Sequence, residues 1–421
     1  MKPASASDDY KGPDLTLDDL LKSGFDSAVT FNIKGTVWHL DAKALLERVA
    51  RRGICKRYGR ECSHWLSGPL VSEWIVGGPI ANEQGKPHPH LAVYFAVRAY
   101  GPAAVWQGLR LIRRYRVRAI WSTYPIMTAH CIARTLSGMA KLPWIADFRD
   151  PVTSSVSAEN PFSVASQKRW ERRVLLSATR AVLTTPGALR TYAERYPEAH
   201  RQGRLTIIGN GYDETAFADL PRPRSRQSGR PLVLLHSGLL YPEGRNPVPF
   251  FTALARLKEA GGMKADNLRI VLRASGSEAT YTREIQRLGL EGMVNLAPPI
   301  SNRQALAEQA KAGALLLFQG SQYDRQIPAK LYEYLRIGRP IFALVGEKGD
   351  TAAVLQDTGG AELVSLDDVT AIETRLIEFI HALREGRGPR ARPAAVARHS
   401  RRDGAKLLAG LLDGAISVVP A

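Results

Sequence analysis

The segment 234-LLHSGLLYPEGRNPVPFFTAL-254 places an apolar run, a turn and a cation in an order that suits phosphate binding. Ser237 and Gly238 end the apolar run, and Arg245 stands just before residues with helical spacing. Backbone amides at the start of a helix, next to a fixed guanidinium, can bind the oxygens of a diphosphate. An ordinary connection between a strand and a helix is the alternative, because the segment has neither a Walker motif nor a GxGxxG sequence.

A second pair of candidates, Lys330 and Glu333, lies in 327-IPAKLYEYLRIGRPIFAL-344. Apolar residues recur there with the helical period until a Gly-Arg-Pro sequence ends the helix. The apolar run that follows predicts a short buried strand at 341–345. The lysine and the glutamate therefore occupy the first turns of a helix that leads into a strand. They form either a surface ion pair or part of a site.

Three charged residues crowd the segment 143-PWIADFRDPV-152. Asp147, Arg149 and Asp150 follow an apolar run that predicts a buried strand, and loops after such strands line ligand sites in parallel α/β sheets. Two carboxylates around one arginine, next to a proline that fixes the turn, favour a functional role over a structural ion pair. We therefore expect these residues to contact a substrate.

Strands and helices alternate along most of the chain, which is the pattern of parallel sheets covered by helices. In the first half, the predicted strands are 117–121, 143–147, 181–185 and 204–209, and the predicted helices are 92–115, 127–139, 163–178 and 187–195. In the second half, the predicted strands are 231–238, 268–276, 293–298, 313–318 and 341–345, and the predicted helices are 247–260, 279–289, 301–311 and 328–337.

This alternation predicts an α/β protein with two Rossmann-like domains that face each other across an interdomain cleft. Residues 1–220 would form the first domain, although residues 1–60 fit the alternation poorly and suggest a strand or a hairpin at 27–41. The polar, breaker-rich segment 221–230 is the predicted linker. Residues 231–400 would form the second domain, and a C-terminal helix in 401–421 could pack back across the domains.

The 421-residue chain carries a formal net charge of +18. Solvent-exposed helix faces, an anionic membrane surface and phosphate-bearing substrates each explain such a charge. Nucleic acid is the least favoured partner, because no aromatic platform or zinc-finger pattern accompanies the basic clusters. The 3 cysteines are too few for a disulfide framework or a metal site, and no apolar run approaches the ~20 residues of a membrane span. We expect a cytoplasmic protein with reduced cysteine thiols.

The order of four motifs, ADFRDP, NGYDETAF, HSGLLYPEGRNP and IPAKLYEYLRIGRPI, is similar to that of group 1 glycosyltransferases with the GT-B fold. The resemblance covers roughly residues 100–415, and its most specific element is the last motif. It implies transfer of a sugar from a nucleotide diphosphate sugar, usually with retention and without a required metal. It also implies an acceptor domain first and a donor domain second.

The resemblance assigns donor-binding roles to residues of the second half. Glu333 matches the glutamate that binds the ribose hydroxyls of the donor. Gly238 and Arg245 match the glycine-bearing turn and the basic residue that hold the diphosphate, and Lys330 could add to that positive charge. The backbone around Pro299 falls where the family contacts the base.

The same resemblance places Asp147, Arg149 and Asp150 in the loop that faces the sugar and the acceptor. Two features depart from the family. Residues 1–60 offer no equivalent of the apolar strand and Gly-rich loop with which the family usually opens. The other departure is a single position. Many members carry a second glutamate at the transferred sugar, eight residues before the ribose-binding one, where this chain has Arg325. The departure predicts a different contact to the sugar, such as a contact to an anionic sugar.

We therefore expect a hexosyltransferase-type glycosyltransferase that builds a surface polysaccharide or a glycolipid. Its acceptor would be a saccharide or a lipid-linked molecule, and its basic residues suit the inner face of a membrane. Two alternatives remain open at this stage: a sugar-nucleotide epimerase on the same fold, and a non-catalytic protein that binds a nucleotide sugar or acts as a scaffold. Analysis of products separates the three.

Overall fold

The computed structural model describes residues 29–33, 36–40, 76–82, 87–94, 101–124, 127–149, 151, 161–218, 220 and 231–418. Within these ranges it describes side chains from residue 104 onward, except at 161–166 and 418. The linker predicted at 221–230 and the candidate site residue Asp150 lie outside the described residues.

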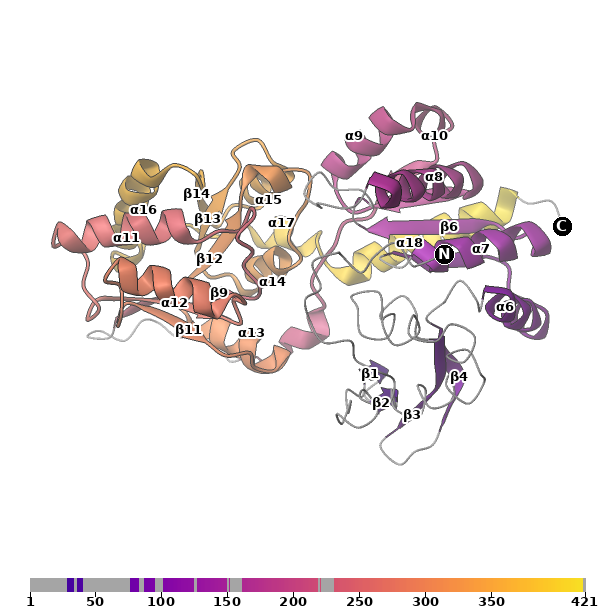
Figure 1. The fold of residues 1–421 in the computed structure, drawn as a ribbon, viewed down its shortest axis with the longest axis horizontal. Helices are drawn as coiled ribbons and strands as arrows, with labels where there is room; N and C mark the ends of the chain where they lie inside the picture. Colours follow the sequence, from indigo (N-terminus) through magenta and orange to yellow (C-terminus); the bar gives the residue numbers. More distant parts are fainter. Residues whose placement is uncertain are drawn as a thin grey trace. The chain divides into compact units, whose positions relative to one another are not determined.

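A six-stranded parallel sheet forms the centre of the C-terminal half of the chain (Figure 1). Its strands are β9 (Leu232–Ser237), β10 (Leu268–Arg273), β11 (Val294–Ala297), β12 (Ala314–Gln319), β13 (Ile341–Val345) and β14 (Ala361–Val364). Their order is β11-β10-β9-β12-β13-β14, and neighbouring strands run parallel. This is the Rossmann order, in which the winding reverses between the first and the fourth strand, here β9 and β12. Ligands of such sheets bind at the carboxyl ends of the strands at this reversal.

Helices cover both faces of this sheet, because the side chains of its strands alternate between two apolar layers. Leu234 points into one layer and Leu235 into the other. Three helices complete the first layer: α11 (Val248–Glu259), α12 (Glu278–Arg287) and α16 (Val369–Arg384). Four helices complete the second layer: α13 (Asn302–Lys311), α14 (Lys330–Ile337), α15 (Asp350–Thr358) and α17 (Pro393–Ala397).

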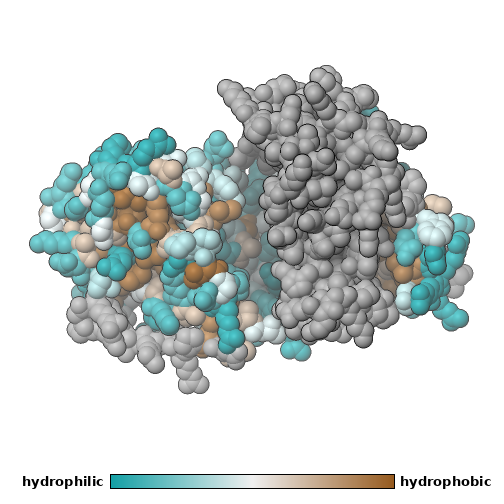
Figure 2. Space-filling model, turned by 60° about the horizontal axis from the view of Figure 1, so that its bottom comes forward, coloured by the Kyte–Doolittle hydropathy of each residue, from teal (hydrophilic) through white to brown (hydrophobic). Residues whose placement is uncertain are grey.

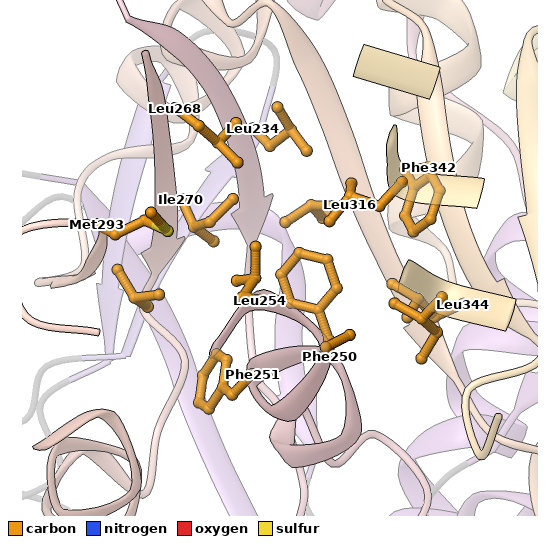
Figure 3. Packing of buried hydrophobic residues seen from close by; sticks show 14 of the residues in the cluster. Leu234, Phe250, Phe251, Leu254, Leu268, Ile270, Met293, Leu316, Phe342 and Leu344 are labelled. Atoms are coloured by element: carbon orange, nitrogen blue, oxygen red, sulfur yellow. The ribbon is translucent and has the colours of Figure 1, made fainter. Parts of the chain in front are cut away.

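The first layer is built around Phe250 of α11, which points at the sheet (Figure 3). Its ring meets that of Phe318 edge to face at 5.7 Å and is tilted against that of Phe342 at 6.5 Å. Such aromatic pairs add about 0.5–1.5 kcal/mol to the stabilisation that comes from burying the rings. The packing fixes α11 on the sheet and therefore also fixes the turn between β9 and α11, which carries several candidate site residues.

A second parallel sheet lies in the first half of the chain, with the order β5-β6-β7-β8. Its strands are β5 (Ile120–Thr123), β6 (Trp144–Arg149), β7 (Arg180–Leu183) and β8 (Leu205–Ile207). The helices that alternate with them are α6 (Gly101–Tyr115), α7 (Met127–Ala140), α8 (Pro161–Ser177), α9 (Pro186–Arg195) and α10 (Pro197–Arg201). Two parallel sheets that alternate with helices confirm the predicted α/β class with two Rossmann-like folds.

The N-terminal part differs from the expectation of a helix over 92–115. An antiparallel sheet of β1 (Val29–Ile33), β2 (Thr36–Leu40), β3 (Val76–Asn82) and β4 (Pro87–Tyr94) is formed there, and α6 begins only at Gly101. Ala92 pairs with Pro79 of β3, the strand that directly precedes β4 in the chain, so strand pairing overrides the helical preference of alanine. The hairpin expected at 27–41 is confirmed by the pairing of β1 with β2.

The chain divides into two compact units, and one of them contains residues Arg180 to Gly414. This unit holds the six-stranded sheet and also α18 (Arg401–Val418) as far as Gly414. The domain boundaries predicted from the sequence stay a prediction. On the face shown in Figure 2, hydrophilic residues of the described surface surround smaller hydrophobic patches. Every helix in the described part of the chain is too short or too polar to cross a bilayer.

Candidate nucleotide-binding site

Gly238 directly follows β9 and leaves space at the carboxyl end of that strand. The φ angle of Gly238 is +106°, and a Cβ atom added there would lie 2.9 Å from Nζ of Lys330. The backbone amide of Gly238 donates to the carbonyl of Arg273 at 2.8 Å, and the amide of Ser237 donates to the hydroxyl of Tyr334 at 2.8 Å. Ser237 and Gly238 thus form a fixed turn next to a lysine side chain, at the reversal of strand order.

Lys330, at the start of α14, brings its amine to this turn. Nζ of Lys330 lies 3.0 Å from Nε2 of His236, the residue of β9 that precedes Ser237. Burial and, to a lesser degree, the charge of Arg245 lower the pKa of Lys330 to about 7, while Glu333 opposes the shift. The amine is therefore close to a cation and a turn, as the sequence predicted, but its main partner is a histidine that the sequence analysis did not consider.

Arg245 is the second cation at the carboxyl edge of the sheet. Its Nε donates to Oε1 of Gln319, the last residue of β12, at 3.1 Å. Its guanidinium lies 5.4 Å from the ring centroid of Tyr241 and 5.4 Å from that of Tyr323. Contacts with an amide and two aromatic rings restrict the orientation of the guanidinium. Side chains of β9 and β12 thus contact a lysine and an arginine at the switch point.

Glu333 follows Lys330 by almost one helical turn in α14 and is largely buried. Burial raises the pKa of its carboxyl, while Arg401 and Lys330 lower it. Arg401, at the start of α18, is positioned by a hydrogen bond from its Nε to the carbonyl of Gly211 at 3.0 Å. A carboxylate near two cations stays able to accept hydrogen bonds from vicinal hydroxyls, as a ribose would offer.

Pro299 lies in the exposed turn that follows β11. The carbonyl of the neighbouring Pro298 accepts a hydrogen bond from Arg273 at 2.7 Å. Arg273 is itself held by Glu308 through two hydrogen bonds of 2.9 and 2.6 Å. A bidentate arginine–carboxylate pair is rigid, so its hydrogen bond to Pro298 restricts the position of the turn around Pro299.

Asp147 and Arg149 end β6, as predicted. Oδ2 of Asp147 lies 3.4 Å from the hydroxyl of Thr123, which donates to it. Arg149 has a φ angle of +54°, a conformation that a residue with a side chain adopts at a cost of about 1–2 kcal/mol. Its carbonyl accepts a hydrogen bond from the amide of Thr184 at 3.2 Å. Strained backbone of this kind is frequent at functional sites.

Arg325 makes its contacts with α9. Its Nη1 donates to the hydroxyl of Thr191 at 2.8 Å, and its carbonyl accepts from the hydroxyl of Thr185 at 2.7 Å. Burial raises the pKa of the neighbouring Asp324, and the charge of Asp350 raises it further. The position that departs from the family pattern is therefore occupied by a guanidinium bound to a helix.

Sequence reasoning found Ser237, Gly238, Arg245, Lys330 and Glu333, which the structure brings together at one end of one sheet. It missed four residues that position them: His236, Gln319, Tyr334 and Arg401. His236 had a visible signal, because it is a polar residue inside an otherwise apolar strand. The other three are recognised only through their contacts.

No protein-family model matches the sequence. No curated protein matches it either. Solved structures do resemble the chain. The sucrose-phosphate synthase tll1590 from Thermosynechococcus elongatus has a TM-score of 0.58 at 14% identity, over 78% of this chain and 82% of that one. Anabaena Alr3699/HepE in complex with UDP-glucose has a TM-score of 0.53 at 14% identity, over 74% and 82%. The trehalose 6-phosphate synthase of Burkholderia multivorans has a TM-score of 0.53 at 14% identity, over 77% of each chain.

These likenesses, together with the two parallel sheets, define the class of fold. The chain has the GT-B fold that its four motifs predict. The similarity extends over about three quarters of the chain, so it is not limited to a single nucleotide-binding half.

Proposed function

We propose that the protein is a glycosyltransferase that moves a sugar from a nucleotide diphosphate sugar to an acceptor hydroxyl. The observation that carries the proposal is the convergence of Lys330, Arg245 and Glu333 at the switch point of a Rossmann-ordered sheet. Two cations suit a diphosphate, and a carboxylate one helical turn away suits a ribose. The complex of HepE with UDP-glucose shows that a neighbour of this fold binds such a donor.

The proposed mechanism is stabilisation of the leaving group. The bond between the anomeric carbon and the β-phosphate oxygen breaks, and the acceptor oxygen forms a bond to that carbon as its proton passes to the departing diphosphate. Negative charge grows on the nucleoside diphosphate, where Arg245 and Lys330 can stabilise it without reorganising. Because these two residues supply positive charge, we propose that transfer requires no metal ion.

Asp147, Arg149 and Asp150 retain their predicted role within this proposal, which is to position the transferred sugar or the acceptor. The strained backbone of Arg149 supports a functional turn at the end of β6. Arg325 supplies no carboxylate at the position of the second family glutamate, so recognition of the sugar would depend on other groups.

The first test is calorimetric titration of the protein with UDP-glucose and other nucleotide sugars, with and without EDTA. We expect micromolar binding that EDTA does not change. Glu333→Ala should weaken it at least tenfold, or by about 1.4 kcal/mol, because the ribose loses its carboxylate partner. Glu259→Ala, at an exposed glutamate near the end of α11, is the matched control and should bind like the wild type. Equal affinity of the Glu333 and Glu259 variants would refute the ribose contact.

The second candidate function is binding of a nucleotide sugar without turnover. The engagement of Arg325 with Thr191 favours it, because that position then offers no acid or base to the sugar. Analysis of products decides: transfer yields a glycosylated acceptor and free nucleoside diphosphate, an epimerase changes the sugar alone, and a binding protein leaves the donor unchanged.

We also propose that the protein works at the cytoplasmic face of a membrane, on a saccharide or a lipid-linked acceptor of a polysaccharide or glycolipid. Helix α6 supports this proposal. Trp106 is 59% exposed and Tyr115 is 49% exposed, and each ring lies next to an arginine, Arg110 at 4.7 Å and Arg114 at 5.4 Å. Exposed aromatic and basic side chains on one helix suit the headgroup region of an anionic bilayer.

A further inference from the structure

His236 is a fully buried polar residue directly beside the proposed donor site, with an exposed fraction of 0%. Its Nδ1 lies 2.9 Å from the carbonyl oxygen of Leu316 in β12. A carbonyl only accepts hydrogen bonds, so Nδ1 must carry the proton. The ring of Phe318 packs against the imidazole edge to face at 5.2 Å and fixes its plane. β12 thus determines both the tautomer and the orientation of His236.

This tautomer leaves Nε2 as an acceptor that faces Lys330. The distance of 3.0 Å between Nε2 and Nζ is that of a hydrogen bond from the ammonium to the ring. Burial keeps the pKa of His236 well below its usual value and the charge of Lys330 lowers it further, while hydrogen bonds with the backbone of Leu316 and Gly238 oppose the shift. The histidine is therefore neutral at physiological pH and accepts a hydrogen bond, and it adds no positive charge to the site.

We propose that His236 is a positioning residue that holds the Lys330 amine at the carboxyl end of β9. Held there, the amine takes up a proton when a diphosphate binds. The proposal deepens the proposed function and rests on it, since the diphosphate is that of the donor. It assigns to the donor site a dependence on pH that neither a fixed arginine nor a solvent-exposed lysine would produce.

The charges around the amine support this assignment. His236 of β9 is neutral, Arg245 of the following turn is positive, and Glu333 of α14 is negative. Gly238 contributes no side chain and leaves the amine in contact with the turn. Burial and the charge of Arg245 lower the pKa of Lys330 to about 7. A bound diphosphate places negative charge beside the amine and therefore raises this pKa.

The direction of the pH dependence follows from linkage. Below the free-state pKa of Lys330 the amine is already protonated, and donor binding takes up no proton. Above it the free amine is neutral while the bound amine is charged, so binding requires a proton from solution. Donor affinity is therefore highest below about pH 7 and falls as pH rises, by up to about tenfold per pH unit, until the bound-state pKa is reached.

The first measurement needs no ligand. The ¹³Cε signal of Lys330, assigned by its loss in Lys330→Met, is followed between about pH 5.5 and 9.5. We expect a midpoint near 7 in the wild type. In His236→Phe, which removes the acceptor but keeps an aromatic ring, the midpoint should fall by about half a pH unit or more, because the ammonium loses its hydrogen bond. His236→Gln restores an acceptor oxygen and should return the midpoint towards the wild-type value.

The second measurement is calorimetry with UDP-glucose at about pH 8 in two buffers of different ionisation enthalpy. UDP-glucose is the probe because its diphosphate is esterified at both ends and has no ionisation near neutral pH. We expect uptake of roughly 0.9 proton by the wild type and none by Lys330→Met. His200→Gln, at an exposed histidine, is the control and should behave like the wild type.

The outcomes distinguish the inference from the function on which it rests. A wild-type signal that does not reach its midpoint by about pH 9.5, as expected for an ordinary lysine, would overturn the inference, as would a midpoint that is the same in His236→Phe. Proton uptake that persists in Lys330→Met would overturn it as well. If Lys330 titrates near 7 and responds to His236→Phe but UDP-glucose and other nucleotide sugars produce no heat, the donor function is refuted and the pairing of the two residues stands.

Discussion

Gly238 shows how one residue can serve two requirements of a site. Its φ angle of +106° belongs to the region that glycine adopts at little cost, and its missing side chain leaves space for the Lys330 amine. Either requirement alone would favour glycine. Together they imply that a methyl group at this position disturbs the site as well as the backbone.

We expect Gly238→Ala to weaken binding of UDP-glucose at least tenfold, because the new Cβ would lie 2.9 Å from Nζ of Lys330 and displace the amine. The control is Gly289→Ala. Gly289 also has a positive φ angle, +61°, but no atom lies within 4 Å of a Cβ added there. Both variants should lose about 1–2 kcal/mol of stability, measured by urea denaturation, and only the first should lose affinity in calorimetry. Equal affinity of the two variants would show that the amine does not need the glycine.

At this scale the sequence identified the groups that would touch a ligand and missed those that hold them. Arg245, Lys330 and Glu333 stand in motifs with a recognisable order. The orientation of His236 depends on a hydrogen bond with Leu316, which is 80 positions away in the chain. Gln319 and Arg245, which also form a hydrogen bond, are 74 positions apart. Contacts over such separations depend on the strand order of the sheet, which a single sequence does not reveal.

At the scale of elements, α9 is anchored at its start by two side chains. Thr185 accepts a hydrogen bond from the amide of Ala188 at 3.0 Å, which is an ordinary helix cap. Asp350, at the start of α15, adds a second acceptor for the amide of Gly187 and an ion pair with Arg190 at 3.0 Å. Because Asp350 is only 6% exposed, its carboxylate depends on these partners.

We expect Asp350→Ala to lower the free energy of unfolding by about 1–3 kcal/mol, because it leaves a buried amide without an acceptor and removes an ion pair. Asp357→Ala is the matched control. Asp357 lies in the same helix and pairs with Arg398, but both side chains are more than half exposed, so the loss should stay below about 1 kcal/mol. Urea midpoints measure both. Similar midpoints for the two variants would contradict the anchoring of α9 by Asp350.

The elements themselves were predicted best where one apolar run is buried on both sides. The strand expected at 341–345 coincides with β13, all of whose residues are buried. The prediction left out α15, β14 and α16, although Ile372, Leu376, Phe379 and Ile380 of α16 have clear helical spacing. β14 is only partly buried and β3 contains two glycines and a proline, so neither has the continuous apolar run that marks a central strand.

At the scale of the whole molecule, the net charge of +18 is a property that solution conditions can probe directly. Attraction between this charge and an anionic bilayer decreases as salt shortens the screening length, from about 30 Å at 0.01 M to about 8 Å at 0.15 M. The exposed aromatic side chains of α6 would add a contribution that depends little on salt.

We expect the protein to bind liposomes that contain anionic lipid at low salt and to dissociate as salt is raised, as measured by sedimentation. Replacement of Arg113 and Arg114 of α6 by glutamine should weaken binding roughly thirtyfold, at about 1 kcal/mol for each charge. The control replaces Arg269 and Arg283, two exposed arginines of the other compact unit, by glutamine. Binding that falls equally in both variants would point to overall charge instead of α6, and no binding at low salt would dismiss the membrane proposal.

Helix α14 carries Lys330, Glu333 and Tyr334 within its 8 residues. Lys330 contacts His236, the charge of Arg401 acts on Glu333, and Tyr334 accepts a hydrogen bond from the amide of Ser237. Each residue of a helix turns by about 100°, so one added or deleted residue before Glu333 would rotate some of these groups out of the site together. The gene can therefore accept no change of length in α14. Insertions and deletions in evolving copies of this chain should accumulate in other segments, and a library built to alter donor preference should keep the length of α14 constant.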